Sequence, residues 1–404
     1  MTSAKGVFVG GGGSVAGGGA DSGAALALGL AALGGVGVLV GFGALGSGAT
    51  LGPQPTMSDV SRGTSRARMR RPTYGGGSAW GKLRQIFTGD GRRWRLPRVT
   101  NRDVYLMSPP GRGWALRGRA NFRSQEAAPV APFRARKEWL ALAEAIEAAG
   151  ATVVVLPPSD ETLTGLPYAA EAGHALPPAA RGQKPRFLLP RMAAPHRVRE
   201  RELWAPLAAR LGFEVIDPGT GLWEGQGDVA AFDGATLLFY GGRTDREGLT
   251  AALRHFDGEV MVLELRQPAF HGNMAVLPLP AVDRLLVCQE VIVGDGLERL
   301  VERFGGGRLD PVSEDEIRSY ATNGLPIGKR WLAPSVVPKR VKERVAQLGM
   351  EVVELDMGEL CEKAGGASRC LVCHAPGVRD QLTIPPESTL AAVRDAIHGE
   401  PDDA

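Results

Sequence analysis

An amphipathic helix, a glycine and a short apolar strand recur five times between residues 138 and 356. The first unit runs from EWLALAEAIEAAG into ATVVVLPP, and the last from VKERVAQLG into MEVVELD. One unit cannot bury both its strand and its helix face, so the repeats are expected to pack around a shared centre. Glycine readily takes the left-handed conformation that stops a helix. The helix-ending glycines fall near residues 150, 212, 258, 306 and 349.

Between the units lie further apolar strand candidates: DVYLMSPP, RFLLPR, TLLFYGG, MAVLPLP and RLLVCQE. With the repeats, they predict a quasi-symmetric closed α/β ring. The alternative is a doubly wound α/β sheet, which predicts a Gly-rich phosphate loop after its first strand. No G-x-G-x-x-G stands between a strand and a helix there, and G-x-x-x-x-G-K followed by Ser or Thr occurs nowhere in the chain. A nucleotide-binding site is therefore unsupported.

The first 98 residues form an N-terminal arm of different composition. Residues 1–23 are Gly-rich, which predicts no fixed structure. Residues 24–45 contain no charged residue and are long enough to cross a bilayer. A basic run, SRGTSRARMRRP, follows them, so the positive-inside rule would leave the bulk of the chain in the cytoplasm. The alternative is a low-complexity Gly/Ala tail, because glycine weakens both helix and apolarity.

The basic charge of the chain belongs to this arm. Residues 1–98 carry twelve Lys and Arg against three acidic residues, about +9, so a net charge of +3 leaves about −6 for the rest. A basic arm can contact anionic lipid or nucleic acid, or remain a solvated tail. We expect no nucleic-acid partner, and any membrane association would come through the arm. The folded domain is expected over residues 99–380, with 381–404 as a C-terminal tail.

Residues 361–377, CEKAGGASRCLVCHAPG, hold three of the four cysteines. Zinc would need Cys361, Cys370, Cys373 and His374, a spacing that is unusual for a zinc site. A thioredoxin-like redox pair belongs between a first strand and a helix, whereas this C-x-x-C follows the fifth unit. So few cysteines make no disulfide scaffold and fit a reducing compartment. Zinc and redox chemistry stay open as alternatives to a single nucleophilic cysteine served by a histidine and a carboxylate.

Two other stretches can supply those partners. His271 lies in PAFHGNMAVLPLP, where it opens an apolar strand and Gly272 leaves room beside the imidazole. GLWEGQGDVAAFDG places Glu224 and Asp228 among glycines just before a strand, and glycine lets the backbone approach a ligand closely. The structural alternatives are a lone core histidine and an ordinary acidic turn.

WEGQGDV, FHGNM and GGASRC occur in the order and rough spacing found in the pentein, or guanidino-group-modifying, superfamily. The chain resembles that superfamily, which includes arginine deiminases, dimethylargininases and glycine amidinotransferases, over about residues 99–375. The segment from TNGLPIG to GGASRC is most similar to dimethylargininases. The resemblance implies an α/β fold, a five-bladed α/β propeller (pentein ring) preceded here by the low-complexity arm. It implies no cofactor and no metal.

The resemblance also implies three catalytic roles. Cys370 follows a glycine-rich turn at Gly365 and matches the nucleophile, with Arg369 and the cationic substrate expected to favour its thiolate. His271 matches the general acid/base, and Glu224 resembles the carboxylate that orients it. A strand that began at Cys370 would turn Cys373 to the opposite face and leave it a bystander.

Substrate-binding roles are implied for Glu171 in YAAEAGH, for Asp228 and for Asn273. Carboxylates bind a planar guanidinium in a bidentate manner. Asn273 stands where many relatives have an aspartate, and EGQGD is one residue longer than the commonest EGGD form. Arg123 and Arg134 are candidates for an arginine that clamps a substrate carboxylate.

These roles predict a dimethylargininase-like amidino-group hydrolase that acts on arginine, methylated arginine or a related small guanidino compound. A covalent amidino-cysteine would be resolved by water. In an amidinotransferase, the alternative, an amine would resolve the same intermediate. A third hypothesis is a catalytically inactive pentein-fold binding protein. The catalytic domain is expected in the cytoplasm, and the sequence carries no signal for the oligomeric state.

Overall fold

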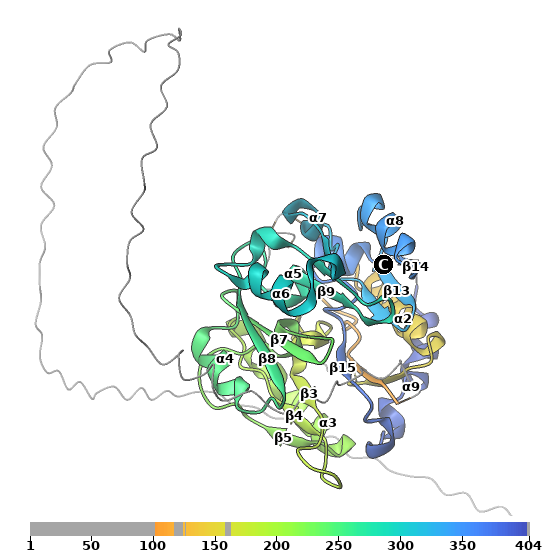
Figure 1. The fold of residues 1–404 in the computed structure, drawn as a ribbon. Coiled ribbons are helices and arrows are strands. Elements are labelled where there is room, and N and C mark those ends of the chain that lie inside the picture. Colours follow the sequence, from red (N-terminus) through yellow and green to blue (C-terminus); the bar gives the residue numbers. More distant parts are fainter. Residues whose placement is uncertain (1–101, 117–123, 126, 158–162, 402–404) are drawn as a thin grey trace, which may run out of the picture. The chain divides into compact units, whose positions relative to one another are not determined.

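The computed structural model describes residues 102–116, 124–125, 127–157 and 163–401. This described part of the chain folds into five three-stranded sheets flanked by helices (Figure 1). The membrane-spanning segment predicted over residues 24–45 lies outside the described residues. Within the described ranges, no helix is both long and apolar enough to cross a bilayer.

In every sheet, the middle strand pairs antiparallel with one neighbour and parallel with the other. Four sheets follow the chain order strand, strand, helix, strand. Their strands are β3 (His174–Leu176), β4 (Arg186–Leu188) and β5 (Glu214–Ile216); β6 (Val229–Phe232), β7 (Ala235–Tyr240) and β8 (Glu259–Glu264); β9 (Val276–Leu279), β10 (Arg284–Val287) and β11 (Leu309–Pro311); and β12 (Leu325–Ile327), β13 (Arg330–Pro334) and β14 (Glu351–Leu355). The helices between the second and third strands are α3 (Arg201–Leu211), α4 (Arg246–Leu253), α6 (Gly296–Phe304) and α8 (Lys339–Gln347).

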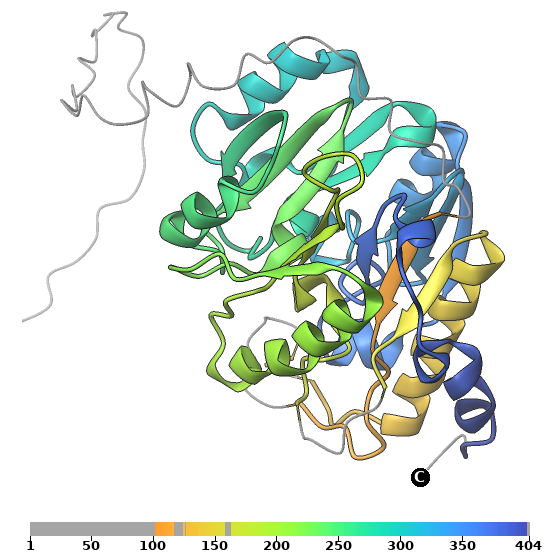
Figure 2. The same cartoon turned by 90° about the horizontal axis from the view of Figure 1, so that it is seen from below.

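The fifth sheet joins the two ends of the domain. It holds β1 (Val104–Met107) and β2 (Thr152–Val155), and its third strand is β15 (Cys373–Ala375), the last strand of the described chain. β1 is parallel to β2 and antiparallel to β15, with Leu106 opposite Cys373. Figure 2 shows the C-terminal segment (blue) beside β1 (orange). The sequence around the predicted nucleophile is thus anchored on the first strand of the domain.

The helix between β1 and β2 shows how the repeat pattern becomes packing. In α2 (Pro132–Ala148), the apolar side chains of Trp139, Leu142, Ala143 and Ile146 follow the spacing i, i+3, i+4, i+7 and are fully buried. Each buried side chain of leucine size contributes about 1.5–3 kcal/mol. Gly150 follows the helix with a φ of 90°, as predicted for a helix stop. Gly305 caps α6 close to the fourth predicted stop near 306, whereas α4 ends at Leu253, before the third predicted stop near 258.

Residues 381–401, which the sequence assigns to a C-terminal tail, include α9 (Ala391–His398). This helix packs on α2. Arg394 pairs with Glu144 at 3.0 Å and with Glu147 at 2.6 Å. Further on, Glu400 pairs at 2.7 Å with Arg136, and both side chains are buried. The packed chain therefore continues beyond residue 380.

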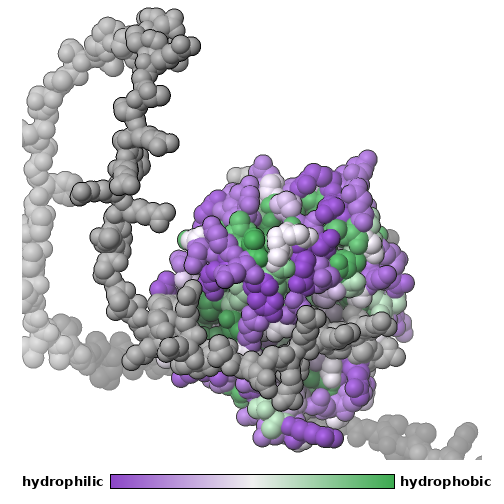
Figure 3. All heavy atoms as spheres, viewed as in Figure 1, coloured by the Kyte–Doolittle hydropathy of each residue, from purple (hydrophilic) through white to green (hydrophobic). Residues whose placement is uncertain are grey.

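Apolar clusters join neighbouring sheets. One cluster includes residues of β1, β2 and β4, and another includes residues of β3, β4, β6 and β7. The sheet β3–β5 therefore packs through apolar side chains against the sheet before it and the sheet after it. The face shown in Figure 3 is mainly hydrophilic, with apolar residues in small scattered groups. Five small sheets joined in this way are consistent with a propeller-like arrangement.

Candidate active site

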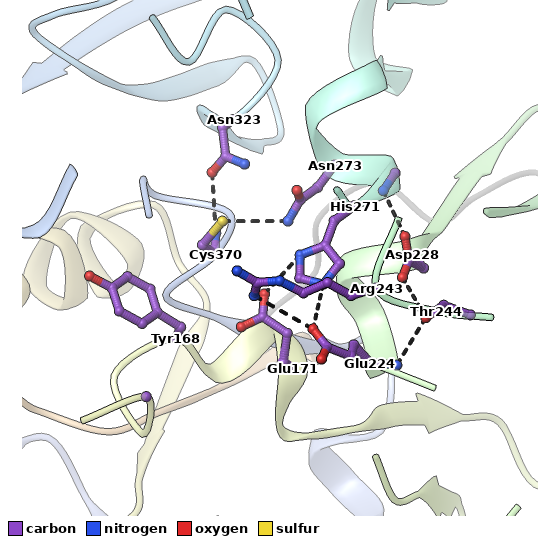
Figure 4. A network of polar contacts seen from close by, with 12 residues as sticks. Tyr168, Glu171, Glu224, Asp228, Arg243, Thr244, His271, Asn273, Asn323 and Cys370 are labelled. Atoms are coloured by element: carbon purple, nitrogen blue, oxygen red, sulfur yellow. Dashed lines mark hydrogen bonds and ion pairs between the residues drawn. The ribbon is translucent and has the colours of Figure 1, made fainter. Parts of the chain in front are cut away.

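The six residues predicted to form a site come together, although they lie on segments far apart in the sequence (Figure 4). Glu171 belongs to the 3-10 helix η1 (Ala169–Ala172), and Glu224 and Asp228 bound the 3-10 turn η3 (Gly225–Asp228). His271 directly precedes the short helix α5 (Gly272–Ala275), which carries Asn273. Cys370 lies in a turn before β15. All six side chains are buried.

His271 lies between two carboxylates. Its Nε2 is 2.8 Å from Oε2 of Glu224, and its Nδ1 is 3.3 Å from Oε1 of Glu171. Burial lowers the pKa of His271. The charges of Asp228, Glu171 and Glu224 raise this pKa by more than burial lowers it, so the net shift is upward. The imidazole therefore keeps a second proton to higher pH than a free histidine and can donate it.

Glu224 is held as a carboxylate. Burial raises its pKa, but the hydrogen bond and charge of His271, followed by the charge of Arg243, lower it to about 2. Its Oε1 also accepts a hydrogen bond of 2.8 Å from the backbone N–H of Ala193. Arg243 Nη1 lies 3.6 Å from Oε2 of Glu224. Glu224 therefore stays ionised and is placed to hold the orientation of the imidazole through its contact with Nε2.

Asp228 holds the backbone that carries the histidine. Its Oδ1 accepts a hydrogen bond of 2.8 Å from the N–H of Gly272, and its Oδ2 accepts one of 2.6 Å from the hydroxyl of Thr244. The Thr244 hydroxyl in turn accepts from the backbone N–H of Glu224. Burial raises the pKa of Asp228 to about 6. These bonds give Asp228 a structural task, and direct contact with a substrate stays a prediction.

Glu171 is fixed by a buried ion pair. Arg197 Nη1 is 2.5 Å from Oε2 of Glu171, and the other guanidinium nitrogens of Arg197 pair with Glu200 at 2.7 and 2.9 Å. The three side chains are at most 6% exposed. Buried carboxylates without a cation would be costly, so Arg197 permits two of them beside the site. It leaves Oε1 of Glu171 directed at His271.

Two asparagines contact Cys370. Asn273 Nδ2 donates to Sγ at 3.6 Å, and the backbone N–H of Cys370 donates to Oδ1 of Asn323 at 3.3 Å. Burial raises the pKa of Cys370 to about 11, with a further rise from Glu171. Arg369 acts in the opposite direction, but its guanidinium donates to the backbone carbonyls of Asn273, Val276 and Thr322. Arg369 therefore favours the thiolate, as the sequence predicts, but burial and the charge of Glu171 outweigh it, and the net shift of the thiol pKa is upward.

Solved structures of known enzymes share this fold. The N-terminal domain of ArgZ, an arginine dihydrolase of cyanobacteria, aligns with a TM-score of 0.60 and 22% identity, over 67% of this chain and 97% of that domain. A dimethylarginine dimethylaminohydrolase aligns with a TM-score of 0.50 and 19% identity, over 67% of this chain and 98% of the other. These enzymes are pentein superfamily members.

The chain has the pentein fold. No protein-family model matches the sequence. Two curated relatives are uncharacterized proteins. YkgA of Bacillus subtilis is 27% identical over 158 residues, which span 38% of this chain and 52% of YkgA, about half its length. ZK1307.1 of Caenorhabditis elegans is 26% identical over 250 residues, 59% of this chain and 82% of that protein.

The cysteines other than Cys370 in this pentein domain are buried and unbonded to one another. β15 begins at Cys373 and not at Cys370, so the strand alternation expected to separate the two thiols does not apply. The Cys373 thiol instead donates to the carbonyl of Gly173 at 3.6 Å, and burial raises its pKa to about 12. Among the described residues, no three His, Cys, Asp or Glu side chains cluster as metal ligands do.

Sequence reasoning missed several residues of the pentein site. Arg197, Arg243, Thr244 and Asn323 all bond to residues at least 16 positions away in the chain, a relation that leaves no local sequence signal. Arg134, considered as a carboxylate clamp, lies on α2, where its half-exposed side chain pairs with Asp356. Arg123, the other candidate, lies outside the described residues.

Proposed function

We propose that the protein is an amidino-group hydrolase that attacks a small guanidino compound with Cys370. The observation that carries the proposal is one buried, acidic site (Figure 4) that holds the His271–Glu224 pair, Glu171 and Cys370, whose sulfur contacts Nδ2 of Asn273. Enzymes of similar fold support it. The ArgZ domain was solved with a covalently bound reaction intermediate, and the dimethylarginine hydrolase as an adduct with S-methyl-L-thiocitrulline.

An unsatisfied polar atom indicates where a guanidinium would bind. Oδ1 of Asn273 is buried without a hydrogen-bond partner, whereas Nδ1 of His271 already faces Oε1 of Glu171 at 3.3 Å. Buried polar atoms nearly always have partners in proteins, so Oδ1 of Asn273 is a candidate acceptor for an N–H of the substrate. Oδ1 of Asn273 and Oε1 of Glu171 can accept N–H groups of a planar cation. Asn273 is uncharged, so Glu171 supplies the negative charge opposite that cation.

The chemistry then follows from the protonation states. Binding of the cation lowers the pKa of Cys370, and the thiol releases its proton to solvent. The sulfur forms a bond to the guanidinium carbon. The carbon–nitrogen bond breaks, and the amine leaves with a proton from His271. An amidino-thioether remains on Cys370. The neutral His271 then takes a proton from water, whose oxygen attacks the same carbon, and the thiolate departs from the ureido product.

We also propose that the five sheets close into a five-bladed propeller around this site. The pairing of β15 with β1 and the apolar clusters between neighbouring sheets support closure. All four cysteines are free, which fits a protein that works in a reducing compartment such as the cytoplasm. An experimental structure with a sheet missing from the ring, or with an open parallel sheet, would contradict the closed propeller.

The function is tested by supplying arginine and methylated arginines with and without glycine as an amine acceptor. We expect a ureido product and a released amine in both cases. A product in which glycine carries the amidino group would assign the protein to the amidinotransferases instead. If the folded protein forms neither product and binds these compounds unchanged, it is a binding protein and the hydrolase proposal fails.

The site is expected to select a cationic alkylating agent over a neutral one of equal size. The carboxylate of Glu171 favours an amidinium beside Cys370, and that cation lowers the pKa of the thiol it faces. At pH 7, 2-chloroacetamidine should modify Cys370 at least about tenfold faster than 2-chloroacetamide, the factor that one unit of thiol pKa supplies. Mass spectrometry of the digested protein measures both rates and the position of the label.

A matched variant separates selection by charge from the intrinsic difference between the reagents. In Glu171→Gln, the ratio of the two rates should fall toward the ratio measured with a free thiol such as glutathione. An unchanged ratio in this variant would show that Glu171 does not face the cation.

A further inference from the structure

Gln226 is the residue that makes the acidic turn one longer than EGGD, and its side chain forms a two-point clasp on another segment. The backbone N–H of His374 donates to Oε1 of Gln226 at 2.6 Å, and Nε2 of Gln226 donates to the backbone carbonyl of His374 at 2.9 Å. The side-chain amide of Gln226 thus hydrogen-bonds both the backbone N–H and the backbone carbonyl of His374, as a neighbouring strand would.

His374 is the middle residue of β15, four positions after Cys370. On one edge, β15 pairs with β1, where His374 lies opposite Tyr105. The N–H and carbonyl of His374 are used by Gln226, so the clasp satisfies part of the other edge. The His374 ring also stacks on Tyr105, with ring centroids 4.6 Å apart. β15 is therefore held from both edges at a single residue.

The same turn reaches a third segment. The backbone N–H of Gln226 donates to the carbonyl of Gly173 at 2.9 Å, two residues after Glu171. Gly225 has a φ of 66°, and a Cβ there would lie 2.7 Å from that carbonyl, so only glycine lets the turn sit so close. Gln226 thus connects the segments that carry Glu171, Glu224 and Cys370.

We propose that Gln226 is a positioning residue that fixes the nucleophile segment against the turn carrying Glu224. The inference rests on the proposed function, since it assigns Gln226 to the reaction of Cys370. Glu224 precedes Gln226 by two residues and holds His271, so a bond from Gln226 to β15 sets where the thiol lies relative to the imidazole. A misplacement of about 1 Å between reacting groups can cost about a hundredfold in rate.

Two variants remove the clasp in different ways. Gln226→Met keeps the length of the side chain and loses both hydrogen bonds. Gln226→Glu keeps the acceptor for the N–H of His374 but, when ionised, sets a carboxylate oxygen against the His374 carbonyl. Asp103→Ala is the matched control. Asp103 accepts a hydrogen bond of 2.9 Å from the N–H of Gly377, just past the other end of β15, and its Oδ1 lies 3.7 Å from Nε2 of the His374 ring. Neither contact involves the acidic turn or the backbone N–H of His374.

We expect both Gln226 variants to lower kcat about tenfold to a hundredfold, with KM changed less than about threefold, because the acceptors for the substrate stay in place. Asp103→Ala should keep kcat within about threefold of the wild-type value, even if it lowers Tm as much as the Gln226 variants do. Backbone amide exchange at His374 should accelerate in Gln226→Met and not in the control. Equal kcat for Gln226→Met and Asp103→Ala at equal loss of Tm would overturn the proposal, because Gln226 would then act on stability alone.

The outcome of this experiment can also be told apart from failure of the hydrolase proposal. If the wild-type protein turns over no guanidino compound, the hydrolase proposal fails, whereas the clasp is still measured by amide exchange at His374 and by the rate at which iodoacetamide modifies Cys370. That rate should change at least threefold in Gln226→Met and stay unchanged in Asp103→Ala. Unchanged exchange and unchanged modification in Gln226→Met would overturn the positioning role whatever the substrate.

Discussion

Replacement of Cys370 by serine is expected to lower turnover of guanidino substrates by at least about a thousandfold, which is the scale seen when a covalent nucleophile is removed. A serine hydroxyl remains protonated where a bound cation can ionise a thiol, so the covalent route is lost. The backbone bonds of Cys370 to Asn323 and Ala367 do not involve the sulfur, and the variant should keep its fold. Initial rates of ureido product formation measure the loss.

Cys373→Ser and Cys288→Ser are the controls for this experiment. Both thiols are buried away from the acidic residues of the site, and burial raises each pKa to about 12. Each variant should retain most of the turnover, with any change traced to a lower Tm. Turnover that survives in Cys370→Ser, or a 2-chloroacetamidine label found on Cys373, would refute the assignment and return attention to redox and zinc chemistry.

The helices and parallel strands of the fold were predictable because each is encoded locally. A helix such as α2 and the strand after it are long enough to show apolar periodicity, and a glycine marks the boundary. β3, β12 and β13 were not predicted: none of them directly follows an amphipathic helix of the repeat, and β3 and β12 have only three residues each. β15 pairs with a strand about 270 residues earlier, a contact that no local pattern encodes.

The site was predictable only in part, for a similar reason. The nucleophile, the histidine and its carboxylate stand in short motifs whose order resembles a known superfamily. The groups that tune them do not. Arg197 neutralises Glu171, and Asn323 bonds the backbone of Cys370, through contacts that form only when the chain is folded. The raised pKa of Cys370 likewise arises from burial, which outweighs the lowering by Arg369 that the sequence predicts.

His271→Ala is expected to lower turnover by about a hundredfold to ten-thousandfold, the usual contribution of a general acid/base. The leaving amine and the attacking water would both lack their proton partner. Modification of Cys370 by 2-chloroacetamidine should persist, because chloride leaves without a proton. A variant that loses labelling together with turnover would show that His271 is needed for the thiol itself. His271→Gln keeps an N–H toward Glu224. It is the control for any effect of leaving the carboxylates of Glu224 and Glu171 without a partner.

Glu224→Gln should act through the same imidazole and reveal itself in the pH profile. The Glu224 carboxylate helps to raise the pKa of His271, so its neutral replacement lowers that pKa. The protonated imidazole that serves the leaving amine then disappears at lower pH. We therefore expect the alkaline limb of kcat to move toward neutral pH, and kcat at pH 8 to fall about tenfold or more. The acid side should keep more of its activity, because His271 is still protonated there. A uniform loss of kcat at every pH, with the alkaline limb unmoved, would mean that the Glu224 charge does not control the proton of His271.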